Sequence, residues 1–309
     1  MNDNVATLRA RWTPELTDAA IRFLQGNPGE VDIPTMQLDG ATLLDLRGIR
    51  IEQTQLDGML IRNVNLRWAT IHDVGFKGAR LVDCNLSQAN FSHCYFRRTM
   101  FQQCDIVNSR FESCEFPNAR FEASRLDFAS FRSCEIDLAS IAFRADANPQ
   151  ALARTCRNLK LNAMSMGRLP DAGELAYMER TYERQMLYRQ AFPREGVKPR
   201  ARFRAVVQWL DSLLFNWLWG YGEKPWRLAF GMLVAIFGFG TLQFALDGLP
   251  GHGWWEHVYF SGVTFSSLGY GDLVPDAPIP RVLAVTEGIL GITFLGMLIA
   301  SATKKIMNR

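Results

Sequence analysis

The sequence predicts a mixed fold in which a β-solenoid precedes a helical linker and an all-α domain with two membrane-spanning helices. Three observations predict it. A large apolar residue recurs every five positions between residues 36 and 145, helical spacing follows over 148–192, and two long apolar runs lie beyond residue 226. We expect four parts: a capping region (1–35), a solenoid (36–145), a helical linker (146–225) and a two-span domain (226–309).

The five-residue period fits neither regular element. Five residues turn about 500° on an α-helix, so the large side chains would scatter around its axis, and an odd period on a strand alternates between faces. A backbone that turns a corner every five residues keeps all of them inside. The large residues are Leu46, Ile51, Leu56, Ile61, Leu66, Ile71, Phe76, Leu81, Leu86, Phe91, Phe96, Phe101, Ile106, Phe111, Phe116, Phe121, Leu126, Phe131, Ile136 and Ile141. Two places before them stand mostly small residues: Ala79, Cys84, Ala89, Cys94, Thr99, Cys104, Ser109, Cys114, Ala119, Ser124, Ala129, Cys134 and Ala139.

This pattern resembles the pentapeptide-repeat family. The resemblance implies a right-handed quadrilateral β-helix with four repeats per coil, in which the large residue and the small one both face inward. Twenty repeats would make five coils and a rod about 24 Å long at about 4.8 Å per rung. Five of the six cysteines occupy small inward positions, so we expect buried reduced thiols and no metal cluster or disulfide framework.

The charge balance excludes several functions. The net charge of +3 is too small for a nucleic-acid partner. Some pentapeptide-repeat proteins are acidic mimics of duplex DNA, but residues 36–145 carry 13 acidic and 13 basic side chains. No nucleophile–base pair is legible, so we predict no enzyme activity and no cofactor.

Flanking helices are predicted on both sides of the solenoid. Thr13–Gly26 reads as a capping helix, with Thr13 as N-cap, Pro14 in the first turn and Gly26 at the stop. In the linker, Glu179 and Glu183 share a face that we interpret as solvated. Residues 206–219 combine aromatic and polar side chains after a basic stretch (Arg194, Lys198, Arg200, Arg202, Arg204), which favours a helix at the membrane surface. A helix packed in the cytoplasmic domain is the alternative.

Two apolar stretches, Leu228–Leu246 and Val282–Thr303, are long enough to cross a membrane. Lys224 and Arg227 precede the first, and Lys304, Lys305 and Arg309 follow the second. The positive-inside rule then places both termini in the cytoplasm. The N-terminus has no secretory signal pattern, so we expect a multi-pass protein of the plasma or inner membrane.

The connection between the spans, residues 259–275, resembles the pore loop of bacterial-type potassium channels through S-L-G-Y-G-D. The resemblance implies a selectivity filter in which backbone carbonyls replace the hydration shell of K⁺. Glu256–Ser266 would be the pore helix, with the negative end of its dipole toward the ion. The filter residues would be Ser267, Leu268, Gly269, Tyr270 and Gly271, K⁺ being the permeant ion that binds the carbonyls of the first four.

Further roles follow from the same resemblance. Asp272, Tyr259, Phe260 and Ser266 would support the filter, with Tyr259 and Phe260 standing where many potassium channels have a tryptophan pair. Ser267 stands where most have threonine. A second tripeptide, Gly220–Gly222, lacks this context and is not predicted to be a filter.

The second span supplies the inner helix. Gly291 follows Gly269 by 22 residues, where similar channels place a gating hinge. The alternative is that Gly288, Gly291 and Gly296 permit close helix packing. Ile292, Leu295 and Ile299 would line the cavity. Glu287 is expected to face protein behind the pore helix.

Two spans per subunit cannot enclose a pore, so the resemblance implies a homotetramer in the lipid bilayer. A poorly selective cation channel and a membrane-anchored interaction scaffold are the alternatives. The sequence also allows the β-helix to bind an unidentified cytoplasmic partner or ligand. The sequence does not reveal the gating stimulus.

Overall fold

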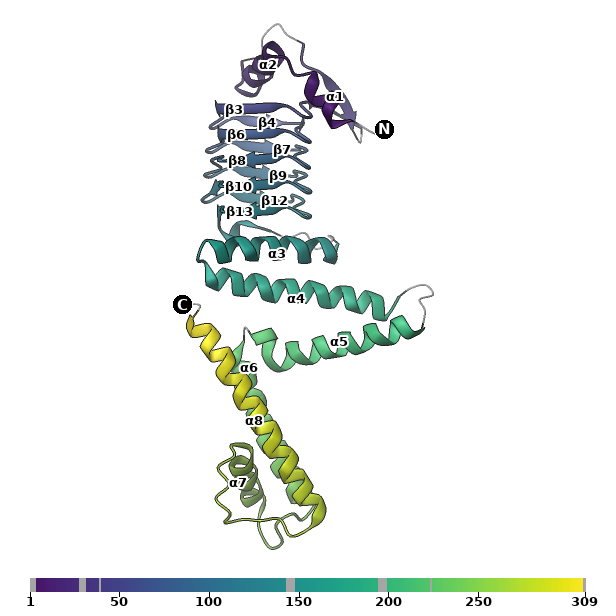
Figure 1. Cartoon of the computed structure of the whole chain (residues 1–309), viewed down its shortest axis with the longest axis vertical. Coiled ribbons are helices and arrows are strands. Elements are labelled where there is room, and N and C mark those ends of the chain that lie inside the picture. Colours follow the sequence, from purple (N-terminus) through teal and green to yellow (C-terminus); the bar gives the residue numbers. More distant parts are fainter. Residues whose placement is uncertain are drawn as a thin grey trace. The chain divides into compact units, whose positions relative to one another are not determined.

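The computed structural model describes residues 4–27, 32–38, 40–142, 148–193, 199–222 and 224–307. Arg194, Lys198 and Arg309 lie outside these ranges, and the side chains of Lys304 and Lys305 are likewise not described. The chain divides into two compact units, Met1–Met186 and Leu187–Arg309. Figure 1 shows the coiled strands of the first unit and the helices of the second.

The first unit contains a β-solenoid of parallel strands that repeat every 20 residues. One face stacks β3 (Arg50–Gln55), β6 (Thr70–Gly75), β8 (Asn90–Ser92), β10 (Arg110–Glu112) and β13 (Ser130–Arg132). Another stacks β4 (Leu60–Arg62), β7 (Arg80–Val82), β9 (Met100–Gln102) and β12 (Arg120–Glu122). β5 (Val64–Asn65), β11 (Glu115–Phe116), β14 (Glu135–Ile136) and single bridges in the same register complete the other two faces. Four five-residue repeats therefore make one coil, as predicted.

The corners explain the five-residue period. A residue with left-handed φ recurs every five positions, for example Asn63 (φ 53°), Trp68 (φ 62°) and Asp73 (φ 53°). Glycine takes this position at Gly58 and Gly78. A left-handed residue turns the extended chain by one corner of the square, so each short strand starts on a new face.

The core consists of the predicted large residues, all of which are buried. Phenylalanines one coil apart stack with centroids 4.9 Å apart for Phe91 and Phe111, and 4.7 Å for Phe101 and Phe121. The predicted small residues are buried too, except Ala139, which is exposed. Ala139 lies in the short 3₁₀ helix η1 (Leu138–Ser140), where the coil has already ended. All six cysteines are buried free thiols.

The solenoid covers about residues 44–136, about five turns, and is shorter than the predicted 36–145. At its start, β1 (Thr35–Leu38) pairs antiparallel with β2 (Ala41–Asp45), so this segment is a hairpin and not a coil. At its end, η1 replaces the next strand. The period continues at Ile141, which is still buried and bridges Phe121.

The N-terminal end is covered as predicted. Helix α2 (Pro14–Leu24) has Thr13 as N-cap, whose hydroxyl accepts from the Leu16 N–H at 3.3 Å. Its Ala20 and Leu24 side chains join the solenoid core. A helix not predicted from the sequence, α1 (Val5–Ala10), precedes it.

The C-terminal end is covered by α3 (Pro149–Ser165), a role not predicted from the sequence. The Asn162 amide pairs with the last coil, accepting from Cys134 N–H and donating to Cys134 C=O, both at 2.8 Å. The Thr155 hydroxyl accepts from Phe128 N–H at 3.1 Å. Helix α3 thereby satisfies backbone groups that an open solenoid end would leave unpaired.

We expect Asn162→Ala to destabilise this end by about 2–3 kcal/mol, because it leaves two buried backbone groups of Cys134 unpaired. The thiol of Cys134 should then react with a labelling reagent about 30- to 100-fold faster under native conditions, as local opening becomes more frequent. Mass spectrometry locates the label. Cys84, which lies more than two coils away, is the internal control and should keep its rate.

Helix α4 (Leu169–Ala191) packs on α3 through an ion-pair cluster around the buried carboxylate of Glu179. Glu179 is 5% exposed and accepts from Arg157 and Lys160, each at 2.6 Å. The prediction that Glu179 lies on a solvated face is therefore wrong. Residue spacing within α4 does not reveal that α3 packs against this face and supplies two cations to Glu179. Burial opposes the charged form, but Lys160 and Arg157 outweigh burial and keep the pKa of Glu179 below its usual value.

Glu179→Gln is expected to lower the free energy of unfolding by about 1–2 kcal/mol at pH 7. Because the pKa of Glu179 is lowered in the folded state, its contribution is present above the unfolded pKa of about 4.3 and is lost as the pH falls through the folded pKa. Urea unfolding of the detergent-solubilised chain, followed by circular dichroism, should show a difference between the proteins at pH 7 that shrinks below pH 4. A constant difference would contradict the ionic role.

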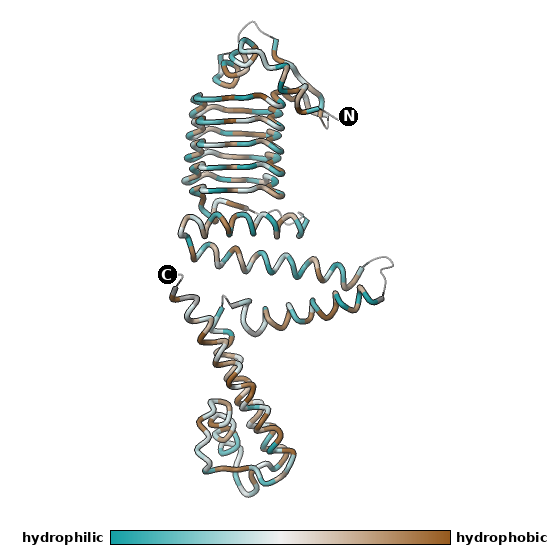
Figure 2. Tube along the Cα trace, viewed as in Figure 1, coloured by the Kyte–Doolittle hydropathy of each residue, from teal (hydrophilic) through white to brown (hydrophobic). Residues whose placement is uncertain are grey.

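The second unit is helical. It contains α5 (Pro199–Trp219), the 3₁₀ turn η2 (Gly220–Gly222), α6 (Pro225–Ala245), α7 (Trp254–Phe265) and α8 (Pro278–Met307). Two segments are long and apolar enough to cross a membrane, Pro225–Ala245 and Pro278–Thr303, and only 17% and 11% of their most apolar windows are buried. Figure 2 shows their hydrophobic residues along both helices. Such exposure distinguishes them from core helices of a soluble domain.

Candidate functional site

The predicted pore helix corresponds to α7 (Trp254–Phe265), two residues earlier at its start than expected. Both spans approach it through glycines. A Cβ on Gly240 of α6 would lie 2.8 Å from the Val258 Cα, and a Cβ on Gly291 of α8 would lie 1.9 Å from the Phe265 carbonyl oxygen. Only glycine permits backbones to approach so closely. Both membrane-spanning helices, α6 and α8, therefore pack closely against α7.

The loop that follows α7 begins with a Schellman motif. Leu268 N–H donates to Val263 C=O at 3.1 Å, and Ser267 N–H donates to Thr264 C=O at 3.0 Å. Ser267 accordingly has a left-handed φ of 58°. Gly269 (φ 55°) and Gly271 (φ 75°) adopt the positive angles expected of them.

The backbone carbonyls of this loop are available to a ligand. Within the ranges that the structure describes, the carbonyls of Ser267, Leu268, Gly269 and Tyr270 accept no hydrogen bond, whereas the first three N–H groups donate back to α7. Carbonyl oxygens and the C-terminal end of a helix dipole both carry negative partial charge. Such a loop is suited to a cation, which it would contact through neutral oxygens.

The predicted supporting residues lie close to the loop. The Tyr259 hydroxyl donates to Asp272 Oδ2 at 2.8 Å, which joins the middle of α7 to the residue after Gly271. The Ser266 hydroxyl donates to the Gly262 carbonyl at 2.7 Å, and so belongs to the helix end. Phe260 is buried. The structure thus brings Tyr259 and Asp272 together, whereas the Phe260 side chain is buried and Ser266 is exposed at the C-terminal end of α7.

The second G-Y-G tripeptide has a different role. Gly220–Gly222 forms the turn η2 between α5 and α6, with Tyr221 at φ 57°. Its hydroxyl contacts Ser212 Oγ at 2.6 Å and donates to the Ser212 carbonyl at 3.0 Å. The tripeptide therefore joins two helices.

Helix α8 carries the remaining predicted residues. Ile292, Leu295 and Ile299 are exposed in the single chain, with 63%, 45% and 59% of their surface accessible. Glu287 is fully buried and contacts Ser261 of α7, so it lies behind the pore helix as expected. The close approach of Gly291 to Phe265 is the packing role that the sequence left open; hinge motion at Gly291 stays a prediction.

Several residues of this site were missed from the sequence. Ser261 contacts both spans, and Gly240 forms the close contact with α7 on α6. His257 is buried, with Nε2 accepting from Leu249 N–H at 3.2 Å and Nδ1 at 2.8 Å from the Gly253 carbonyl. The sequence signal for these residues is a small or polar side chain inside an apolar stretch. That signal does not identify the contact partner, which depends on how the helices pack together.

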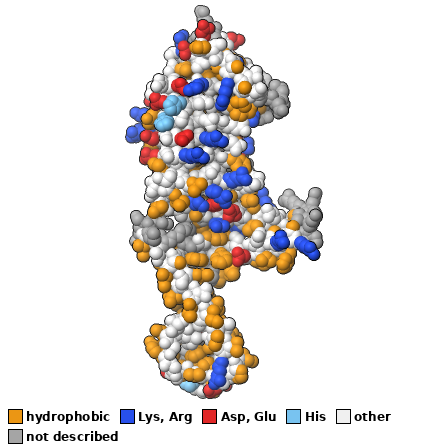
Figure 3. Space-filling model, viewed as in Figure 1, with side chains coloured by type: hydrophobic (Ala, Val, Ile, Leu, Met, Phe, Trp, Pro, Cys, Tyr) orange, Lys and Arg blue, Asp and Glu red, His pale blue; other side chains and the backbone are white. Residues whose placement is uncertain are grey.

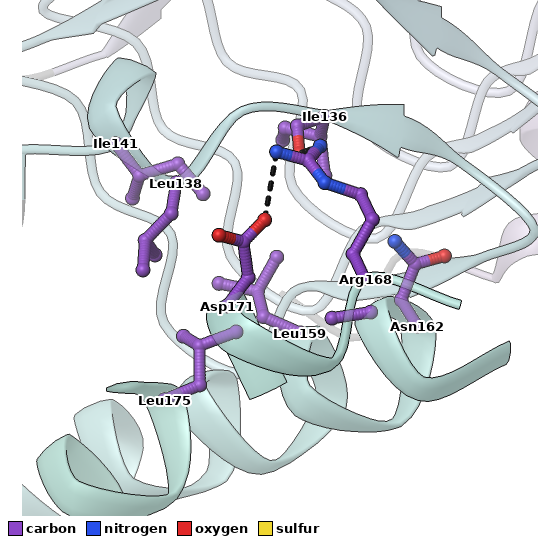
Figure 4. Close-up of a pocket in the computed structure, with 9 residues that line it drawn as sticks. Ile136, Leu138, Ile141, Leu159, Asn162, Arg168, Asp171 and Leu175 are labelled. Atoms are coloured by element: carbon purple, nitrogen blue, oxygen red, sulfur yellow. Dashed lines mark hydrogen bonds and ion pairs between the residues drawn. The ribbon is translucent and has the colours of Figure 1, made fainter. Parts of the chain in front are cut away.

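The first unit shows no comparable site among its described residues. Figure 4 shows a pocket between the last coil, α3 and α4, across which Arg168 pairs with Asp171 at 2.7 Å. The pocket has room for about one water molecule. Figure 3 shows basic and acidic side chains interspersed on the visible face of the rod, as expected for its even charge balance.

Comparison with known proteins agrees with this division of the chain. Residues 231–308 match the family model described as "Ion channel", and residues 76–146 match the "Pentapeptide repeat region". The chain is also 30% identical over 95 residues to "Two pore potassium channel b" of Oryza sativa subsp. japonica. That match covers 29% of this chain and 27% of the relative's length.

Solved structures similar to part of the chain are pentapeptide repeat proteins. One from the cyanobacterium Cyanothece 51142 is 14% identical and covers 32% of this chain and 88% of that chain, with a TM-score of 0.17. HetL from Nostoc sp. Strain PCC 7120 is 16% identical and covers 28% and 44%, also with a TM-score of 0.17. The β-helix assignment itself rests on the strand register and on the family model. In one polypeptide, this membrane protein joins a pentapeptide-repeat β-helix to an ion-channel domain.

Proposed function

We propose that the chain is one subunit of a homotetrameric potassium-selective channel of the plasma or inner membrane, with both termini in the cytoplasm. The observation that carries the proposal is the loop after α7. It presents unpaired carbonyls of Ser267, Leu268, Gly269 and Tyr270 next to a helix C-terminus. Four copies around an axis would surround a dehydrated K⁺ with oxygens, and the Ser267 hydroxyls would add the innermost ring.

The surface of the single subunit supports assembly. Leu268 and Tyr270 are 61% and 67% exposed, although the loop connects two apolar helices. Irregular backbone is tolerated at membrane depth only where protein or a water-filled path surrounds it. A fourfold arrangement would meet that condition, with Ile292, Leu295 and Ile299 lining the cavity below the filter.

A flux assay tests the proposal. Purified protein in liposomes should pass K⁺ with little Na⁺ flux, and cross-linking should give a tetramer. Comparable fluxes of the two ions would favour a poorly selective cation channel. Absence of both fluxes would favour a membrane-anchored scaffold in which the β-helix binds the partner.

Helix α5 is proposed to lie at the membrane surface. One stripe of α5 is apolar and exposed, consisting of Phe203, Val207, Leu210, Leu214 and Trp217 at helical spacing. Basic side chains stand around the start of the stripe, with Arg200 and Arg202 before Phe203 and Arg204 after it. An apolar face with basic neighbours suits the boundary between headgroups and acyl chains of an anionic bilayer.

Spin labels test the position of α5 in liposomes that contain anionic lipid. A label at Leu210 should be accessible to oxygen dissolved in the bilayer and protected from a water-soluble paramagnetic reagent. A label at Gln208, on the opposite side of the helix, is the matched control and should show the reverse. Equal access of the water-soluble reagent to both positions would contradict a surface-bound helix.

A further inference from the structure

Three helices of the second unit meet at two buried polar side chains, Ser261 of α7 and Glu287 of α8. Both are 0% exposed in the single subunit, so neither lipid nor a neighbouring subunit reaches them. Ser261 Oγ lies 2.7 Å from the Ile236 carbonyl oxygen of α6. The same Oγ is also hydrogen-bonded to Glu287 Oε1.

Counting protons decides the direction of these two bonds. A serine hydroxyl has one proton to donate, and a backbone carbonyl only accepts. The contact with Ile236 therefore uses the proton of Ser261. The contact with Glu287 then needs a proton from the carboxyl group, which an ionised carboxylate does not have.

The second carboxyl oxygen leads to the same conclusion. Glu287 Oε2 is buried and has no hydrogen-bond partner among the described residues. A buried carboxylate with an unpaired oxygen would be costly, whereas the bare carbonyl oxygen of a neutral acid costs much less. Described residues offer Glu287 no cation, since its only polar contact is Ser261.

We propose that Glu287 is a neutral carboxylic acid that positions the pore helix. It donates to Ser261, which donates to Ile236, so that one chain of hydrogen bonds joins α8, α7 and α6. One turn further along, Gly291 meets Phe265. On α7 the contacting residues are Ser261 and Phe265, four positions apart, and on α8 they are Glu287 and Gly291, also four apart. Helix α8 therefore holds α7 at two successive turns, just before the loop begins.

This positioning role rests on the proposed function, because α7 would hold in place the loop that is proposed to be the selectivity filter. Glu287→Gln keeps the length and a donor, and should keep the K⁺-to-Na⁺ flux ratio within about twofold of the unmodified protein. Glu287→Met keeps the length without the donor, and Ser261→Ala removes the acceptor. Each of these two should lower the flux ratio at least tenfold. A flux ratio unchanged by Glu287→Met would overturn the proposal.

Infrared spectroscopy supplies a readout that does not depend on conduction. At neutral pH the protein should show the carbonyl band of a protonated carboxylic acid, which Glu287→Gln removes and Ser261→Ala shifts. Absence of that band refutes the neutral acid, whatever the flux variants do and even where they fail to assemble. If the unmodified protein lacks potassium selectivity but shows the band, the proposed function fails while the protonation of Glu287 stands.

Discussion

The double substitution Gly269→Ala and Gly271→Ala is expected to reduce potassium flux to background. Both glycines have positive φ, at 55° and 75°, and a Cβ on either meets nothing within 4 Å. The effect therefore comes from backbone conformation and not from a clash in the subunit. An alanine in the left-handed region costs about 1–2 kcal/mol, and four subunits would each carry two such positions. The loop should relax to other angles and turn its carbonyls away from the ion path.

Gly251→Ala is the matched control for this prediction. Gly251 also has positive φ, at 80°, has open space around it, and lies in the same connection between the spans, but before α7. Its substitution introduces similar strain outside the loop and should leave liposome flux of K⁺ nearly unchanged. If the double variant conducted like the control, carbonyls of residues 267–270 would not be the ion-binding groups.

Much of the fold was predictable because each coil repeats the same local pattern of buried residues and corners. The five-residue period fixes which side chain enters the core, and a left-handed corner at positions such as Asn63 and Asp73 follows from the turn that this period demands. The ends of the solenoid were not predictable in this way. There the period is broken by a hairpin and by η1, and the partner of the last coil is a helix whose Asn162 reaches Cys134 across 28 residues.

The candidate site shows the same division between local and tertiary information. Positive φ at Gly269 and Gly271, and the pore helix itself, followed from a short motif and its flanks. The hydrogen bond from Tyr259 to Asp272 joins two residues whose supporting roles the motif indicates separately, without showing that they contact each other. Ser261 was missed because its importance depends on Ile236 and Glu287, which come from two other helices. Local pattern identifies the loop, whereas the packing that positions it requires three-dimensional information.

Gly291→Ala is the second substitution for which we expect a large effect. A Cβ on Gly291 would lie 1.9 Å from the Phe265 carbonyl oxygen and 2.7 Å from its carbonyl carbon. Both groups are backbone, so no flexible side chain moves aside, and α8 has to separate from the end of α7. Overpacking of this kind costs at least about 1–3 kcal/mol in each subunit. We expect at least a tenfold loss of assembled protein on size-exclusion chromatography, with a parallel loss of flux.

Gly296→Ala provides the control on the same helix, because a Cβ there meets nothing within 4 Å. It should assemble and conduct normally, helped slightly by the better helix propensity of alanine. The pair of variants also separates the two roles considered for Gly291. If the glycine serves only as a gating hinge, Gly291→Ala assembles as well as Gly296→Ala and differs only in how often the channel opens. If close packing against Phe265 is essential, assembly fails before gating can be measured, because the pore helix loses its place beside the inner helix.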